Sequence, residues 1–495
     1  MKHVHSQLFD SPALLLSLTA CLAMTACGTA PSTGVQLHVQ DPAAVAEPSG
    51  QNPSNRTPSN QTPSSQNPSP AERQVDASDA PSHASLDLGF ADSGISFGNS
   101  KNWSGLRFNY RDRAAQKITG LNLTLWSPQG IGIEEFQGIA LGVTPSARSS
   151  SGLRAGLVSV VSDTSDGIDV AGLAAVSNGD TMGIRAAGIA TVAEGSADGF
   201  GFAGIATITK KQSRGLHVAG VATVSEGGMQ GIHAAAIATV AGKSMSGLQI
   251  GGIAATAKGD ISGITAGGIA VISEGDATGL TVGGIVTVAA KSMTGLQLAG
   301  LAAVSEGDLA GLTVAGVAVV GERSLTGLHA SGIATVSEGP IFGVGVSGLA
   351  TVSEQSITGI EVAGLSMAAE EGVRGVGVAG LMLSDTKHSS WDVMPRAPDP
   401  EGRSISMNRG ILIAGLRTDA CNVEGVTIAG LVNRSCDFDG VGISALNSVS
   451  GMQRGLQVGV VNYAQDLRGV QIGLLNYVPS NPWYLRWMPL VNFRF

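Results

Sequence analysis

The sequence predicts an all-β protein, a repetitive parallel β-solenoid built from coils of 14–16 residues. A glycine recurs every 16 residues through thirteen consecutive units, which together span residues 183–390. Within each unit apolar positions alternate with other positions, and Val, Ile and Thr are frequent, which is typical of strands. Cys421 and Cys436 occupy the same position, the twelfth, of two consecutive units. A short repeat of this kind indicates stacked units that bury a face only against one another.

The cysteine pair distinguishes this fold from its alternative, an antiparallel meander or an outer-membrane β-barrel. In a parallel stack, equal positions of neighbouring coils lie about 4.8 Å apart. That spacing brings Cys421 and Cys436 within the roughly 4.4–6.8 Å Cα separation of a disulfide. In a meander they would fall in turns at opposite ends of the strands. Because cysteines of exported chains tend to pair, we predict a disulfide between them.

The barrel alternative has one supporting observation, the last five residues. Residues 491–495 alternate apolar side chains and end in Phe495, similar to the closing strand of outer-membrane barrels. Aromatic residues, however, make up only 4% of the chain, whereas barrels carry aromatic girdles at both interfaces. No polar face for a barrel lumen can be drawn from the repeated units either. The solenoid is therefore the favoured fold.

Residues 1–27 have the pattern of a lipoprotein signal peptide. An apolar run begins at Ala13 and reaches Met24, too short to span a bilayer, which needs about 20 residues, but typical of a secretory leader. Small residues precede Cys27 and resemble the bacterial lipobox, whose cysteine is acylated and becomes the mature N-terminus. Cys21 is an alternative site, but cleavage there would shorten the apolar run. We predict lipidation at Cys27.

Residues 28–104 are predicted to form a disordered tether. The stretch 51–68 carries proline at every fifth residue among Ser, Asn, Gln and Thr. Such residues cannot bury enough apolar surface to offset the entropy of ordering. A leader, a tether and a folded body follow one another as in a surface-displayed lipoprotein.

The folded body is predicted to have two repeat regions separated by an insertion. Residues 105–390 form the first β-repeat region, and residues 410–495 form the C-terminal repeats and cap. About 23 units are recognisable, with glycine expected at tight corners of the coil. The intervening loop 391–409 contains three prolines and is expected to interrupt the stack.

Candidate chemistry is sparse. Five consecutive units carry an acid at the twelfth position: Glu306, Glu322, Glu338, Glu354 and Glu370. In a parallel stack these acids would form a carboxylate ladder able to attract Ca²⁺. The favoured interpretation is a turn face whose charges are solvated and screened. His217, His233 and His329 share the variable third position and are expected to face solvent. A column of threonines could form a flat binding face or could simply favour strands. We predict no catalytic residue, metal site or cofactor.

The two ends of the body resemble a known family. The segments 455–464 and 469–477, with the pattern Gly-Leu-Gln-Val-Gly-Val-Val-Asn-Tyr, are similar to the repeats of bacterial surface-repeat lipoproteins. Residues 489–495 look like that family's tail, and 120–126 resemble its opening. The resemblance is best over 105–137 and 410–495. It implies a surface-associated protein of uncharacterised activity, and it supplies no catalytic residue.

These features predict location better than activity. The chain has 29 basic and 38 acidic residues, a net charge of −9, which argues against nucleic acid as a partner. We expect a protein anchored by its N-terminal lipid at the outer membrane or cell surface, with a structural or adhesive role and a cell-surface or extracellular protein or glycan as partner. The alternative is an outer-membrane barrel, a pore or transporter, with a lipidated arm.

Overall fold

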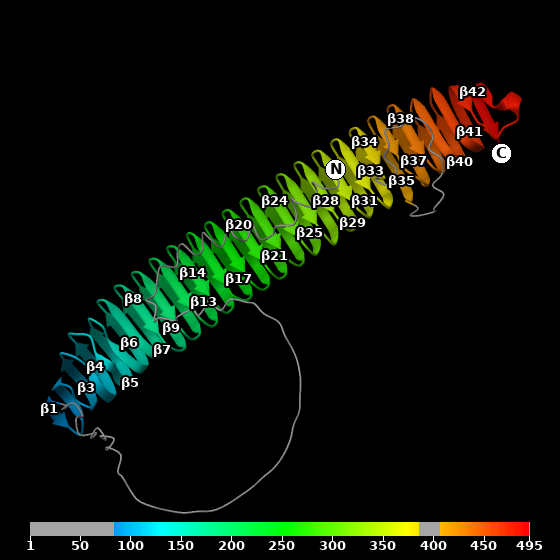
Figure 1. Ribbon diagram of the computed structural model, residues 1–495. Coiled ribbons are helices and arrows are strands. Elements are labelled where there is room, and N and C mark those ends of the chain that lie inside the picture. The colour runs from blue at the N-terminus through cyan, green and yellow to red at the C-terminus, as the bar shows by residue number, and fades with distance from the viewer. Residues whose placement is uncertain (1–83, 386–405, 495) are drawn as a thin grey trace, which may run out of the picture. The chain divides into compact units, whose positions relative to one another are not determined.

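A computed structural model describes residues 84–385 and 406–494. This body is a parallel β-solenoid of about 22 turns with coils of about 16 residues, and it is not a barrel (Figure 1). The predicted fold is therefore confirmed, and the alternative of a meander or an outer-membrane barrel is wrong. Through the regular coils, each strand pairs in parallel with the equivalent strand of the next coil, at equal positions, as in β13 (Ser213–Ala219) with β15 (Met229–Ala235) and β14 (Ala222–Ser225) with β16 (Ala238–Ala241).

Each regular coil consists of a long strand, a tight turn, a short strand and a polar turn. The long strands are β9 (Thr181–Ala187), β11 (Ala197–Ala203), β13 (Ser213–Ala219), β15 (Met229–Ala235), β17 (Met245–Gly251), β19 (Ile261–Gly267), β21 (Ala277–Gly283), β23 (Met293–Ala299), β25 (Asp308–Ala315), β27 (Ser324–Ser331), β29 (Ile341–Ser347), β31 (Ser356–Ala363), β33 (Gly372–Ala379), β35 (Asn408–Ala414), β37 (Val423–Ala429) and β39 (Phe438–Ile443).

The short strands follow the long ones after the tight turn and form a second parallel ladder. They are β10 (Ala190–Ala193), β12 (Ala206–Thr209), β14 (Ala222–Ser225), β16 (Ala238–Ala241), β18 (Ala254–Ala257), β20 (Ala270–Ser273), β22 (Val286–Ala289), β24 (Ala302–Ser305), β26 (Ala318–Gly321), β28 (Ala334–Ser337), β30 (Ala350–Ser353), β32 (Ser366–Ala369), β34 (Met382–Ser384), β36 (Arg417–Asp419) and β38 (Val432–Ser435).

The end regions have antiparallel caps, and β4 to β7, β40 and β41 are longer than the strands of the regular coils. The end regions comprise β1 (Ser85–Phe90), β2 (Ser93–Gly98), β3 (Asn102–Asn109), β4 (Arg113–Thr124), β5 (Gln129–Gly142), β6 (Ser146–Gly156), β7 (Ser159–Ala171) and β8 (Ala174–Ser177) at the start, and β40 (Leu446–Val458), β41 (Val461–Tyr477), the 3₁₀ helix η1 (Trp483–Leu485) and β42 (Trp487–Arg494) at the end. β1 pairs antiparallel with β2, and β42 pairs antiparallel with β41. Each end of the long-strand ladder therefore finishes in one antiparallel strand.

The described strands begin earlier than the sequence predicted. β1 and β2 lie at Ser85–Gly98, inside the range assigned to the tether, so the predicted boundary at 104 is too late. Their residues alternate large apolar side chains with small or polar ones but lack the 16-residue period that predicts the coils. Most of the predicted tether, residues 28–83, lies outside the described residues.

The insertion after β34 does not interrupt the stack, contrary to expectation. Gly375 of β33 pairs directly with Gly410 of β35, and β34 pairs with β36. β35 already begins at Asn408, within the predicted loop 391–409. The inserted residues leave from the end of a short strand, where added chain length leaves the strands of the coil in place. Residues 386–405 themselves lie outside the described residues.

The coil turns the bulky apolar side chains of its second, fourth and seventh positions outward and buries those of its fifteenth position. We count positions from the first glycine of each coil and call the residues at one position of successive coils a column. In the coil that starts at Gly215, Leu216 and Val218 point outward, whereas His217 and Ala219 are buried. The third, fifth, ninth, eleventh and fifteenth positions form the core, and the second, fourth and seventh face outward, because successive strand residues point to opposite sides.

This alternation corrects two expectations. His217, His233 and His329 are only 5%, 0% and 3% exposed, so the third position faces the core and not solvent. The threonine column, represented by Thr223 and Thr239 at 1% and 0% exposure, is also internal and forms no flat binding face. The interior lies between two closely spaced sheets, so it accepts small residues at most positions.

Glycine recurs at two places in the coil, with Ala236 replacing it once at the second of them. Gly215, at the first position, has φ +107° within its long strand, and a Cβ there would lie 2.1 Å from the oxygen of Gly199 in the preceding coil. Gly220, at the sixth position, lies at the tight turn, where a Cβ would be 2.0 Å from the oxygen of Gly204. The first glycine therefore lies within a strand and not at the corner that the sequence suggested, and the close approach of successive coils explains both columns.

Candidate functional surfaces

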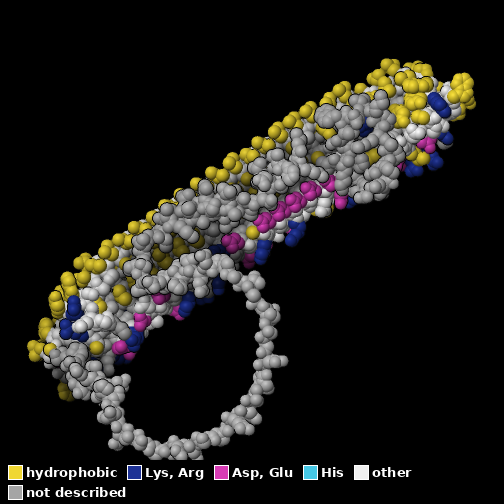
Figure 2. All heavy atoms as spheres, viewed as in Figure 1, with side chains coloured by type: hydrophobic (Ala, Val, Ile, Leu, Met, Phe, Trp, Pro, Cys, Tyr) yellow, Lys and Arg dark blue, Asp and Glu magenta, His cyan; other side chains and the backbone are white. Residues whose placement is uncertain are grey.

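One long edge of the rod is apolar and the opposite edge carries most of the charge. Figure 2 shows hydrophobic side chains as a continuous band along one side and acidic and basic side chains along the other. We define the apolar edge as the outward side chains at the second, fourth and seventh positions of the coils that span residues 183–390. Its seventh-position column lies at the tight turn and contains Ile189, Ile205, Val221, Ile237, Ile253, Ile269, Ile285, Leu301, Val317, Ile333, Leu349, Leu365 and Leu381.

The side chains of the apolar edge are solvent-exposed to an unusual degree. Ile237, Leu301 and Ile333 are 43%, 50% and 44% exposed. Backbone donors of the tight turn are bonded to the neighbouring coil: the N–H groups of Gly252, Ile253 and Ala254 donate to the carbonyl oxygens of Ala235 and Ile237 at 2.9, 2.8 and 3.0 Å. The tight turn thus exposes hydrocarbon without exposing free backbone donors.

The opposite edge, which we call the acidic edge, is formed by the polar turns around the twelfth position. The predicted acids lie in this turn in consecutive coils; Glu306, Glu322, Glu338 and Glu354 are exposed and Glu370 is half-buried. Partial burial, followed by the neighbouring carboxylates of Glu338 and Glu306, raises the pKa of Glu322. Within residues 84–385 and 406–494 no group of three or more His, Cys, Asp or Glu is placed to hold a metal ion.

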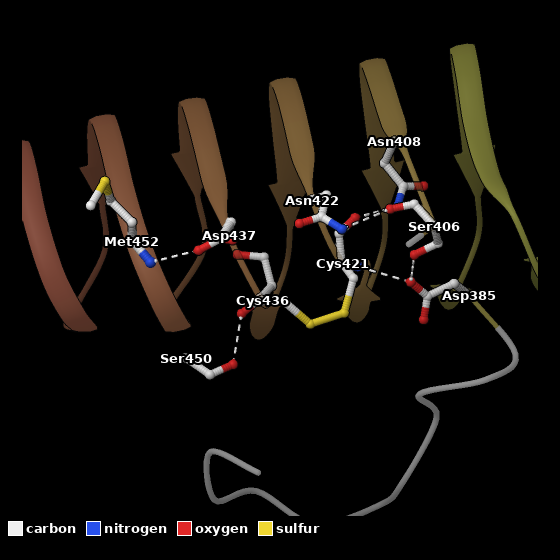
Figure 3. Close-up of a disulfide and its surroundings, with 10 residues drawn as sticks. Asp385, Ser406, Asn408, Cys421, Asn422, Cys436, Asp437, Ser450 and Met452 are labelled. Carbon is white, nitrogen blue, oxygen red and sulfur yellow. Dashed lines mark hydrogen bonds between the residues drawn. A yellow bond between two sulfur atoms is a disulfide. The ribbon is translucent and has the colours of Figure 1, made fainter. Parts of the chain in front are cut away.

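The predicted cysteine pair lies beside the insertion (Figure 3). Cys421 and Cys436 are joined by a disulfide between adjacent coils, with their Cα atoms 4.6 Å apart. An Oδ2 atom of Asp385 accepts hydrogen bonds from the Cys421 N–H at 2.8 Å and from the Ser406 hydroxyl at 2.5 Å. Asp385 and Ser406 are the described residues on either side of 386–405, so these bonds hold the two ends of the insertion together against the bridged coils.

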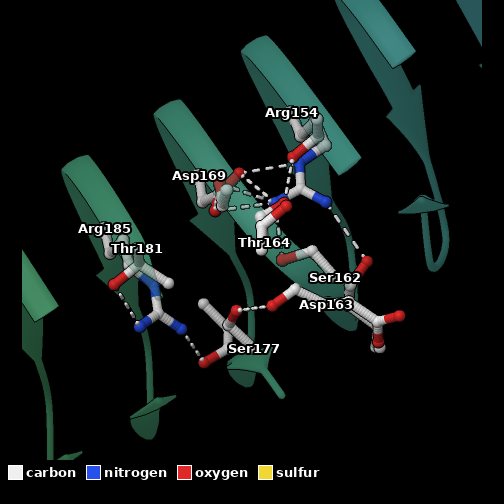
Figure 4. Close-up of polar contacts among 12 residues, drawn as sticks. Arg154, Ser162, Asp163, Thr164, Asp169, Ser177, Thr181 and Arg185 are labelled. Atoms are coloured by element: carbon white, nitrogen blue, oxygen red, sulfur yellow. Dashed lines mark hydrogen bonds and ion pairs between the residues drawn. The ribbon is translucent and has the colours of Figure 1, made fainter. Parts of the chain in front are cut away.

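Charged side chains at the third position pair inside the rod, a feature that the sequence analysis missed. Arg154 and Asp169 belong to adjacent coils and form two hydrogen bonds of 2.8 Å, while Ser165 donates to the same carboxylate at 2.6 Å (Figure 4). Burial lowers the pKa of Arg154, and the Asp169 carboxylate opposes this effect. Arg185 in the next coil donates to the carbonyl oxygens of Ala175 and Val192 at 2.7 and 2.8 Å.

Two buried histidines continue this column. The rings of His217 and His233 stack with centroids 5.1 Å apart. Nε2 of His233 lies 3.0 Å from the hydroxyl of Ser213, and the Gln249 amide lies 3.4 Å from Nδ1. Burial, and then the neighbouring His217, lower the pKa of His233 to about 3. The pair is therefore neutral at physiological pH and acts as core packing.

Asparagines of the family-like repeats form a further internal ladder. Amide groups of Asn433, Asn447 and Asn462 donate in turn to the next side chain, ending at Asn476, at 3.2, 2.8 and 2.8 Å. The recurring Asn of these C-terminal units thus links coils through the core. The sequence contains a signal for these buried side-chain pairs, because oppositely charged or amide side chains recur at equal positions of adjacent coils.

Comparisons place the chain beside no known protein. No family model, no curated protein and no solved structure matches it. Among residues 84–385 and 406–494, no helix is long and apolar enough to cross a membrane. The predicted lipidation sites Cys27 and Cys21 lie outside the described residues.

Proposed function

We propose that the protein is exported and lipid-anchored at the bacterial cell surface, where its rod has a structural or adhesive role without catalysis. The observation that carries the proposal is the repetition of one surface in coil after coil. The apolar edge and the acidic edge present equivalent side chains at intervals of about 4.8 Å. A surface that repeats along an axis suits many weak contacts with an extended partner.

Two further features support this proposal. The Cys421–Cys436 disulfide is typical of an oxidising, extracytoplasmic compartment. The sequence before the rod has the pattern of a leader that ends at Cys27, with Cys21 as the alternative acylation site. A lipid at Cys27 would attach the rod to the outer membrane, and an extracellular protein or glycan would be its partner.

Acylation and surface exposure test this proposal together. Cells that express the full chain are fed an alkyne analogue of palmitate, and the protein is examined for label. We expect the parent and Cys21→Ser to be labelled and Cys27→Ser to be unlabelled. Proteinase added to intact cells should degrade the labelled protein. A parent chain that takes up no label, or a labelled chain protected in intact cells, would contradict the proposed anchoring or exposure respectively.

A further inference from the structure

The apolar edge is too large to be an ordinary exposed patch. Through the thirteen coils of residues 183–390, its three columns contain only Ala, Val, Ile, Leu and Phe. At about 4.8 Å per coil it extends for roughly 60 Å, and its width is roughly 16 Å along the strand. An area on the order of 1,000 Å² exceeds the few hundred Å² that monomeric proteins normally expose. Such a surface needs an occupant.

The shape of the apolar edge favours a lipid layer over a protein surface as the molecule that covers it. Its seventh-position column lies at a tight turn between the long-strand sheet and the short-strand sheet. The eighth and tenth positions, mostly Ala and Val, continue the apolar surface around that turn onto the short strands. A flat protein surface, including that of a second copy, would cover one side of this convex edge. A lipid layer can cover both sides at once.

The chemistry of the edge points the same way. Within its columns aromatic residues appear only at Phe200 and Phe202, and Trp, Tyr, Arg and Met, which are enriched at protein interfaces, are absent. The turn donors are bonded within the solenoid, as at Gly252, Ile253 and Ala254. N–H donors that enter hydrocarbon must be satisfied internally, and those of Gly252, Ile253 and Ala254 are.

Charge is segregated to match a membrane surface. The acidic turns lie on the side away from the apolar edge (Figure 2), so immersion of the apolar edge keeps the ionised side chains in water. The predicted acylation site also lies upstream: 56 residues separate Cys27 from Ala84, where the described body begins. An acylated chain would hold the rod at the same bilayer.

We propose that the rod lies lengthwise on a phospholipid bilayer, with its apolar edge in the interfacial layer and its acidic edge in water. It is the β-sheet counterpart of an amphipathic helix that lies in the plane of the membrane. The inference rests on the proposed function for its membrane location, but the contact it describes is made by the rod and not by the lipid anchor.

Flotation with vesicles of pure phosphatidylcholine tests the contact without the anchor. The probe is the full chain carrying Cys21→Ser and Cys27→Ser, so that no acyl group is attached. The edge variant adds Ile237→Lys, Leu301→Lys and Ile333→Lys. The matched control adds three lysines at exposed sixteenth positions beside the same coils: Gln230→Lys, Thr294→Lys and Thr326→Lys. All three proteins share the same leader, and circular dichroism verifies their fold.

We expect the parent and the control to float with the vesicles and the edge variant to lose at least tenfold in partition coefficient. Equal flotation of the edge variant and the parent would overturn the proposal. A parent that stays unbound, or that sediments as a dimer which the edge lysines dissociate, would also overturn it, the latter result assigning the edge to a second copy. Because no lipid is attached in this assay, failure here leaves the acylation result, and thus the proposed anchoring, unaffected.

Discussion

Nε2 of His329 lies 3.0 Å from Oε2 of Glu361, two coils further along the chain, across a space left by Gly345. The other carboxylate oxygen accepts a hydrogen bond from the Thr351 hydroxyl at 2.8 Å. Both His329 and Glu361 are almost fully buried. This buried polar pair spans two coils because a glycine occupies the same position of the coil between them.

The first prediction concerns that glycine. A Cβ at Gly345 would lie 1.9 Å from His329 Nε2 and 2.1 Å from Glu361 Oε2. We expect Gly345→Ala to displace the pair and to lower the free energy of unfolding by about 2–4 kcal/mol, measured from urea denaturation. Gly377→Ala is the control, because its Cβ would meet flexible ends of Leu383 and Met367 at 3.1 and 3.2 Å. An equal loss in both variants would show that the buried pair is not the cause.

The second prediction concerns acid sensitivity. The pKa of His233 is lowered to about 3 in the folded chain, against an ordinary value of 6.5. Between these values the unfolded chain binds the additional proton, so stability falls as the pH falls, by about 1.4 kcal/mol per pH unit. We expect His233→Gln, which introduces the residue found at Gln249, to remove this dependence. Denaturation at pH 7 and pH 4 should show the variant gaining about 3 kcal/mol relative to the parent at the lower pH. A constant difference between the two proteins would contradict the assigned pKa.

The third prediction concerns the bridge between Cys421 and Cys436, which are 15 residues apart. Removal of a disulfide that closes a loop of this length costs about 3 kcal/mol. We expect Cys421→Ser with Cys436→Ser, or treatment of the parent with reductant, to lower the denaturation midpoint to a similar extent. Mass mapping of the exported protein under non-reducing conditions should recover the two cysteines in one linked peptide. Two alkylated thiols obtained without reductant would refute the bridge.

The fourth prediction concerns the acidic edge. The pKa of Glu322 is raised by partial burial and by the carboxylates of Glu338 and Glu306. A carboxyl group with a raised pKa in the folded chain destabilises the fold at pH values above that pKa, and the effect disappears below the ordinary pKa. Glu322→Gln should therefore raise the melting temperature slightly at pH 7 and leave it unchanged at pH 3. High salt should reduce the gain, since exposed charges are screened; a gain that persists at pH 3 would exclude this electrostatic cause.

The repeat in the sequence is sufficient to predict that successive coils run parallel and that equal positions pair. Glycine at a constant interval requires the same close backbone approach in every coil, and in the structure Gly215 pairs with Gly231, as the parallel stack predicts. The shared unit position of Cys421 and Cys436 led to the same stack, because parallel coils bring equal positions together. These inferences needed no knowledge of which side chains face inward.

The tertiary structure alone decided which face is internal. Strand alternation permits two opposite phases, and both sets of side chains in these units contain small apolar residues. The sequence alone therefore does not place the third position of His217 in the core. The distinguishing signal was size: small Ala, Ser and Thr occupy the fifth, ninth and eleventh positions, whereas Ile and Leu occupy the second and seventh. Contacts such as His329 with Glu361 are 32 residues apart and depend on the space left by a third residue. Local sequence determines the period of the solenoid, but the packing of its long and short strands determines that the polar third position is enclosed, whereas the Ile and Leu of the second and seventh positions are left outside.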